Sequence, residues 1–180
     1  MSKKMKWQDG NIFSLKLRDD LYTLVQMRKD YYLQFFDIKS SFDGWSDVNL
    51  AATDTLFFVF TSTAALKALV VSEPSPEKVS PDKRRPQKIM LRAIIGGNWG
   101  ADLIELPDSL EGLDAAVLKS NLTLENDLDT IYRYELSGMV MDPDKLRERL
   151  INYFDQGINW DVSKAFLFKG IAPPPAKNGL

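Results

Sequence analysis

The stretch between Trp7 and Ile38 constrains the fold more than any other part of the chain. It holds three short runs rich in aromatic and branched apolar residues, separated by two charged turns. Runs of this kind are typical of β-strands that follow one another in a meander. Phe13, Leu15 and Leu17 alternate along the first run, which predicts a strand with one buried face. The third run is apolar on both faces, as in a strand that is covered on both sides.

Several later segments add to this meander. Residues 56–61, 88–95 and 103–106 are apolar runs typical of strands. Ser62 is suited to cap a short helical turn, because its side-chain oxygen can accept a bond from a free backbone amide. Residues 72–88 contain four prolines and no apolar periodicity, which predicts an exposed loop.

The strongest helix prediction covers residues 142–157. Asp142 is a favourable N-cap, and Gly157 can take the left-handed conformation that ends a helix. Leu146 and Leu150 lie on one apolar stripe, which predicts that the helix packs on a sheet. The chain is therefore predicted to be α+β, with a mainly antiparallel twisted sheet that can close partly like a small barrel and with this C-terminal helix on one face.

The composition excludes several kinds of catalytic site. The 180 residues include no cysteine and no histidine. Thiolate nucleophiles, disulfides, Ser-His-Asp triads and zinc sites built on histidine are therefore excluded. The formal net charge of −2 gives no overall attraction to nucleic acid or to an anionic membrane. We expect a protein with no catalytic residues, no metal and no cofactor, which works by binding.

Length and hydropathy bound the domain organisation and the location. We expect one β-rich domain over residues 1–172, followed by a proline-rich tail over residues 173–180. No apolar run approaches the ~18 residues of a membrane span, and the N-terminal stretch lacks the apolar region of a signal peptide. The expected location is therefore the cytoplasm.

A family resemblance follows from a pattern in the first two runs, formed by Trp7, Gly10, Ile12, Phe13, Leu17, Asp20, Tyr22 and Val25. This pattern resembles the opening of the immunity protein 26 family, small β-rich bacterial proteins associated with polymorphic toxin systems. Residues 54–66 and 159–170 are also similar to segments of that family. The resemblance implies an immunity protein that neutralises a cognate toxin, such as a nuclease, by occluding its active site or substrate groove.

Acidic residues concentrate in one part of the sequence. Residues 101–135 contain nine acidic and two basic residues, whereas residues 61–100 contain three acidic and seven basic ones. Such segregation creates a local field that the near-neutral total conceals. In an immunity protein the carboxylates would fit a basic toxin cleft and speed association. The candidate partner-binding acids are Asp102, Glu105, Asp108, Glu111, Asp114, Glu125, Asp127 and Asp129.

Two tryptophans in polar segments are candidate anchors for a partner. Trp45 lies in a loop rich in serine and aspartate, and Trp99 lies among three glycines. Buried tryptophans often supply much of the binding energy of an interface. A loop tryptophan can equally fold back on the core, and this is the favoured interpretation of Trp45.

The basic cluster suggests an alternative function. It consists of Lys83, Arg84, Arg85, Lys88 and Arg92. Such a cluster could bind nucleic acid or a regulatory partner. No aromatic residue interleaves the charges of residues 83–88 to stack on bases, so we expect a solvated loop and no nucleic-acid partner.

A metal site is the last alternative. Glu125, Asp127 and Asp129 alternate and could face Ca²⁺ or Mg²⁺ in an extended segment. The segment lacks the central glycine and distal glutamate of an EF-hand loop. We therefore interpret it as an acidic turn.

Overall fold

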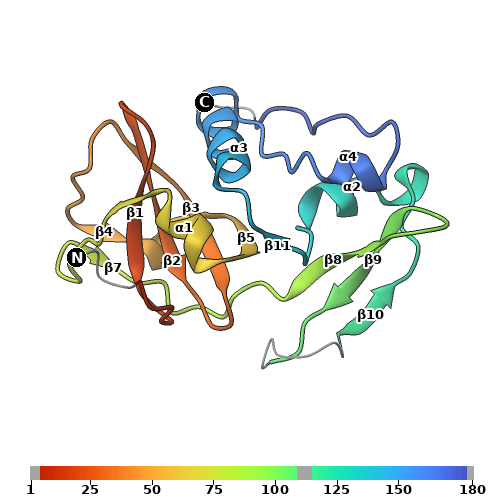
Figure 1. The fold of residues 1–180 in the computed structure, drawn as a ribbon, viewed down its shortest axis with the longest axis horizontal. Coiled ribbons are helices and arrows are strands. Elements are labelled where there is room, and N and C mark those ends of the chain that lie inside the picture. The colour runs from red at the N-terminus through yellow and green to blue at the C-terminus, as the bar shows by residue number, and fades with distance from the viewer. Residues whose placement is uncertain (1–4, 109–114, 178–180) are drawn as a thin grey trace. The chain divides into compact units, whose positions relative to one another are not determined.

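The computed structural model describes residues 5–108 and 115–177, and these form two compact units (Figure 1). The first unit comprises Met1–Pro86 and Met139–Ile151, and the second comprises Gln87–Gly138 and Asn152–Leu180. A compact unit need not fold on its own. The single domain expected over residues 1–172 therefore stays a prediction.

The first unit is built on a curled six-stranded sheet with the order β11-β5-β3-β2-β1-β6 (Figure 1). Strands β1, β2, β3 and β5 pair antiparallel in succession, β6 pairs antiparallel with β1, and β11 pairs parallel with β5. The predicted meander is confirmed. The strands of this sheet are β1 (Ile12–Arg18), β2 (Leu21–Met27), β3 (Tyr32–Ser40), β5 (Thr55–Thr61), β6 (Val70–Ser72) and β11 (Met139–Val140).

Short elements join and cover these strands. The helix α1 (Thr63–Lys67) follows Ser62, whose side-chain oxygen accepts a hydrogen bond from the amide of Ala65 at 3.1 Å, so the predicted cap is confirmed. The strands β4 (Val48–Asn49) and β7 (Val79–Ser80) pair parallel, and the 3₁₀ helix η1 (Leu50–Ala52) follows β4.

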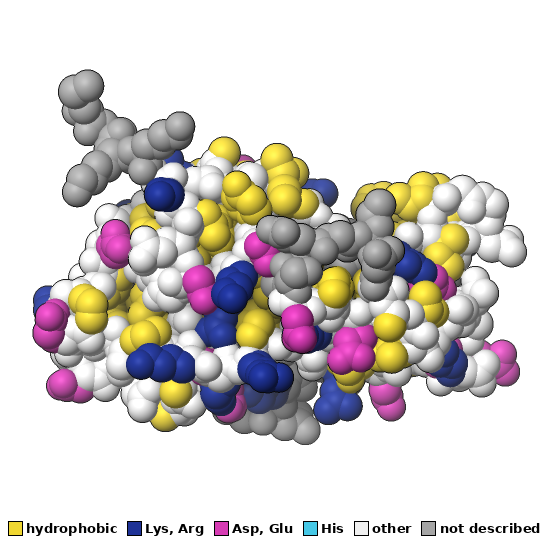
Figure 2. Space-filling view, turned by 90° about the horizontal axis from the view of Figure 1, so that it is seen from below, with side chains coloured by type: hydrophobic (Ala, Val, Ile, Leu, Met, Phe, Trp, Pro, Cys, Tyr) yellow, Lys and Arg dark blue, Asp and Glu magenta, His cyan; other side chains and the backbone are white. Residues whose placement is uncertain are grey.

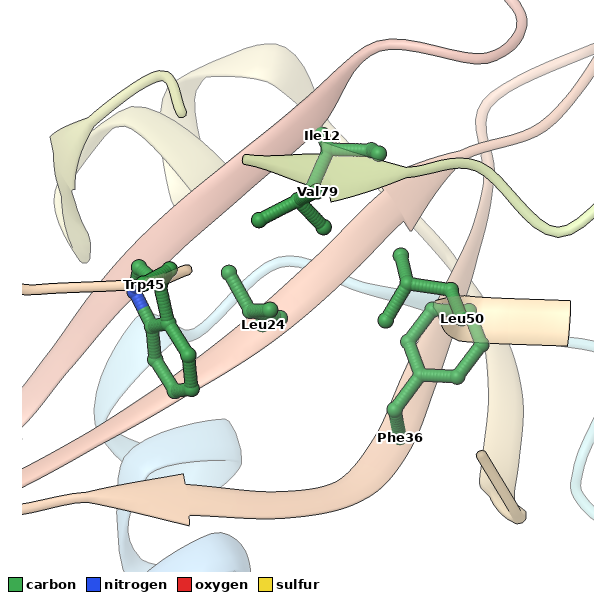
Figure 3. Close-up of a cluster of buried hydrophobic side chains, with 6 residues drawn as sticks. All are labelled: Ile12, Leu24, Phe36, Trp45, Leu50 and Val79. Atoms are coloured by element: carbon green, nitrogen blue, oxygen red, sulfur yellow. The ribbon is translucent and has the colours of Figure 1, made fainter. Parts of the chain in front are cut away.

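The core of this sheet explains a wrong prediction for β1. Ile12, Leu24 and Phe36 project from β1, β2 and β3 onto one face of the sheet (Figure 3). A second group of side chains covers them, formed by Trp45, Leu50 and Val79. This cover buries β1 on both faces, including Ser14, whereas the alternating pattern predicted one buried face. An alternating strand can therefore be central when loops cover its more polar side.

The predicted C-terminal helix is confirmed as α3 (Pro143–Gln156). The carboxylate of Asp142 accepts a hydrogen bond from the amide of Asp144 at 2.9 Å, and Gly157 follows the helix with φ of 71°. Leu150 is buried, and the Arg149 guanidinium lies 3.9 Å from the centre of the Phe57 ring on β5. The helix therefore packs on the sheet of the first unit, and the α+β fold class is confirmed.

The second unit contains a three-stranded antiparallel sheet with the order β10-β9-β8. Its core joins the sheet to α2 and α4 through Leu91, Ala101, Leu122, Ile131 and Leu167. The prediction missed β10 and α2. The elements are β8 (Ile89–Ile94), β9 (Gly100–Glu105), β10 (Ala116–Lys119), α2 (Leu124–Arg133) and α4 (Lys164–Leu167). No helix in the described parts of the chain has the length and apolar character needed to cross a bilayer.

Candidate functional site

The proline-rich segment is partly buried, and this corrects the prediction of an exposed loop over residues 72–88. Asp82 is only 3% exposed, and the side chain of Gln26 on β2 forms hydrogen bonds with its backbone. The Asp82 amide donates to the Gln26 side-chain oxygen at 2.7 Å, and the Asp82 carbonyl accepts from the Gln26 side-chain nitrogen at 2.8 Å. The guanidinium of Arg28 donates to the carbonyls of Asp82 and Arg84. Side chains of the sheet therefore hold this segment in place.

The Asp82 carboxylate completes the attachment. It accepts hydrogen bonds from the Gln34 amide at 2.9 Å, from the Arg84 backbone amide at 2.8 Å and from the Arg84 guanidinium. Burial raises the pKa of Asp82, but the bonds from Arg84 and Gln34 outweigh it and lower the pKa to about 2. These hydrogen bonds hold the segment around Asp82 against the sheet, and we call them the Asp82 latch.

Replacing Asp82 by alanine is expected to lower the free energy of unfolding by about 2 to 3 kcal/mol, because Gln34 and the Arg84 amide lose a charged acceptor. Urea denaturation at pH 7 measures the change. Lys83→Ala is the matched control, since Lys83 is exposed and surface changes usually stay within about 0.5 kcal/mol. Equal stability of the two variants would contradict the latch.

The same latch predicts how stability depends on pH. The folded pKa of about 2 lies below the ordinary value of 3.8, so the stabilisation from Asp82 is full well above pH 3.8. It is lost as the pH falls through about 2. Between pH 3.8 and about pH 2, the free energy of unfolding of the wild type should therefore decline more steeply than that of Asp82→Ala. Parallel curves for the two proteins would contradict this assignment.

Most of the basic cluster is engaged in ion pairs. Arg84 pairs with Asp82, and Arg92 pairs with Asp102 at 2.9 Å. Lys88 also carries an ion pair, so Lys83 and Arg85 remain as exposed cations without an ion pair in the described chain. Figure 2 shows basic and acidic side chains interspersed on the face that it draws. The cluster therefore presents less free charge than its sequence indicates.

Three of the candidate acids are also engaged internally. The Asp102 carboxylate accepts from the Asn121 amide at 2.9 Å and pairs with Arg92, and these contacts lower its pKa. Asp108 pairs with Lys88. The sequence predicted these carboxylates to be free for a partner, whereas in the structure Asp102 holds the chain before α2.

Asp127 is 5% exposed and acts inside α2, which corrects the prediction of an acidic turn. Its carboxylate pairs with Lys119 and accepts from the Thr123 amide at 2.9 Å, and both contacts lower its pKa. Glu125 is exposed, whereas the Asp127 carboxylate is buried and paired with Lys119, so the two do not form the cation site that an extended chain would allow. Among the described residues, no group of three or more acidic side chains could hold a metal ion.

The remaining candidate partner-binding acids among the described residues are exposed and have no ion-pair or hydrogen-bond partner within the described chain. They are Glu105 on β9 and Glu125 and Asp129 on α2. Glu125 and Asp129 lie on either side of Asp127, where the backbone of α2 departs from helical geometry. Glu111 and Asp114 lie outside the described residues.

The two candidate tryptophans have different environments. Trp45 is 8% exposed, and its indole nitrogen donates to the Ser14 hydroxyl at 2.9 Å, so the interpretation as a core residue is confirmed. It is not an exposed anchor. Trp99 is 57% exposed and lies at the tip of the hairpin between β8 and β9. Ile95, at the start of the same turn, is 74% exposed, and sequence reasoning missed it because it continues an apolar strand.

Comparison with known proteins identifies a family. The family model described as "Domain of unknown function (DUF8309)" matches residues 2–173. No curated protein and no solved structure matches the chain. Since the model spans nearly the whole chain, the protein belongs to the DUF8309 family.

Proposed function

We propose that this protein is an immunity protein, which binds a cognate bacterial toxin and neutralises it by occluding the active site or substrate groove. The resemblance of the N-terminal pattern to the immunity protein 26 family gives the class of partner. The observation that carries the proposal is a set of three exposed carboxylates on the second unit that have no partner among the described residues, which are Glu105, Glu125 and Asp129.

The charge balance of the second unit supports a basic partner. This unit contains 7 basic and 11 acidic residues, a net charge of −4, whereas the first unit contains 16 basic and 14 acidic residues, a net charge of +2. Within the second unit, Lys88, Arg92 and Lys119 each pair with an aspartate. Without Glu111 and Asp114, which lie outside the described residues, the unit contains 7 basic and 9 acidic residues, a net charge of −2. This excess of negative charge favours association with a cationic protein cleft.

The basic cluster gives weaker support to the alternative of nucleic-acid binding. Arg84, Lys88 and Arg92 are already paired, so few phosphate contacts remain for them. We therefore place the toxin-binding function first.

Reversing the three free carboxylates is expected to slow toxin binding. The variant Glu105→Lys/Glu125→Lys/Asp129→Lys should associate about tenfold more slowly at low salt, because exposed interface charges act mainly on the association rate. Surface plasmon resonance with the purified product of the neighbouring toxin gene measures this rate. Asp127 is left unchanged, because its buried carboxylate holds α2.

A control with the same total change in charge separates this effect from the change in net charge. Asp9, Glu73 and Glu148 are exposed acids of the first unit, and a variant that changes all three to lysine should associate at the wild-type rate. Equal rates for the triple variant and the wild type would remove these carboxylates from the proposal. No binding of the wild-type protein would overturn the proposed function itself.

A further inference from the structure

The tip of the hairpin between β8 and β9 presents two large apolar side chains to solvent. The last pair of the ladder joins Ile94 to Gly100, so residues 95–99 form the turn. Ile95 is 74% and Trp99 57% exposed, and within the described chain the Trp99 ring has no hydrogen-bond, cation–π or aromatic partner. Isolated exposed apolar residues are common, but two large ones at the ends of one turn form a small apolar projection.

The projection is held on an ordered support. Six residue pairs join β8 to β9 directly below it. Beside the ladder pairs nearest the tip, the Leu122 amide donates to the Ala101 carbonyl at 2.9 Å, and the Asn121 amide donates to the Asp102 carboxylate at 2.9 Å. Figure 1 shows this loop next to the hairpin tip, leading into α2. A projection that is fixed before binding loses less entropy when it enters a pocket.

The negative charge of the second unit favours a cationic protein as the partner of the hairpin tip. The loop beside it leads directly into α2, which carries Glu125 and Asp129, two carboxylates without a partner in the part of the chain that the structure describes. The unit as a whole has a net charge of −4. Phosphate groups of lipid or nucleic acid would be repelled by this surface, whereas a cationic protein would be attracted. Tryptophan is also the residue type most enriched among the dominant contacts of protein interfaces.

We infer that Trp99, supported by Ile95, is the anchor of the interface and enters an apolar pocket of a protein whose surrounding surface is basic. This inference rests on the proposed function and adds to it the contact that holds the complex together. The free carboxylates speed association, while the tip slows dissociation.

The experiment compares three proteins by surface plasmon resonance against the purified product of the neighbouring toxin gene, which gives both the affinity and the dissociation rate. These are the wild type, Trp99→Ala, and the control Phe166→Ala. Phe166 lies on α4 in the same unit and is 74% exposed, so it matches Trp99 in being a large exposed aromatic. Trp99→Ala should weaken binding by about 30-fold or more, mainly through faster dissociation, and Phe166→Ala should bind as the wild type does.

The possible outcomes distinguish the anchor role of Trp99 from the proposed toxin-binding function. Wild-type binding that Trp99→Ala leaves unchanged would overturn the anchor and keep the proposed function. No wild-type binding would overturn both. Co-sedimentation with phosphatidylglycerol vesicles that is lost in Trp99→Ala would also overturn the inference, because the tip would then be a lipid anchor. Thermal unfolding checks the fold of Trp99→Ala, which should match the wild type because the side chain is exposed.

Discussion

Trp45→Ala is expected to lower the free energy of unfolding by about 3 to 5 kcal/mol. The indole packs in the cluster that contains Leu24 and Phe36, and it covers one face of the first sheet (Figure 3). Its removal leaves a large void and also leaves the buried Ser14 hydroxyl without the bond from the indole nitrogen. Both effects act in the same direction, which makes this the largest single change that we expect.

Urea denaturation followed by far-ultraviolet circular dichroism measures this loss. Trp99→Ala is the matched control, since it removes the same side chain from an exposed turn and should change stability by less than about 0.5 kcal/mol. Similar losses in the two variants would contradict the assignment of one tryptophan to the core and the other to the surface.

Leu150→Ala is expected to lower the free energy of unfolding by about 2 to 5 kcal/mol. Leu150 is fully buried on α3, beside Arg149, whose guanidinium lies over the Phe57 ring of the sheet. The truncated side chain would leave a cavity where the helix meets the sheet, and helix propensity would not offset it, because leucine and alanine are both good helix formers.

The denaturation midpoint of Leu150→Ala should therefore fall well below that of Glu148→Ala. Glu148 lies two residues earlier on the exposed face of the same helix, so its replacement tests the effect of alanine without a cavity. A Leu150→Ala midpoint equal to that of Glu148→Ala would show that α3 contributes little packing energy to the sheet.

The elements that could be predicted from sequence are those whose signals are local. The meander follows from apolar runs and charged turns, and its second turn adopts positive φ at Asp30 and Tyr31, which suits a tight hairpin. The helix α3 follows from its N-terminal aspartate, its terminal glycine and its apolar stripe. In each case the residues that specify the element lie within it or beside it.

The helix α2 shows how a local signal was misinterpreted. Thr123 caps the helix by accepting a bond from the Asn126 amide at 3.3 Å, and acidic residues in the first turn favour a helix N-terminus. The alternating carboxylates suggested a turn instead. A non-helical backbone conformation at Asp127 interrupts the helix.

The latch at Asp82 could not be predicted, because its partners are distant in the sequence. Gln26 and Gln34 lie 56 and 48 residues away, and nothing near Asp82 indicates that it is buried. The same limit applies to the candidate site. Acidic segregation was visible in the sequence, but only the fold distinguishes the engaged carboxylate of Asp102 from the unpaired one of Glu105.

The proposed function, that this protein neutralises a toxin by occluding its active site or substrate groove, is tested by an activity assay of the purified product of the neighbouring toxin gene, titrated with the wild-type protein. Toxin activity should fall in proportion to the added protein and be abolished near equimolar ratio. Full toxin activity in the presence of a large molar excess would show that the protein does not neutralise this toxin.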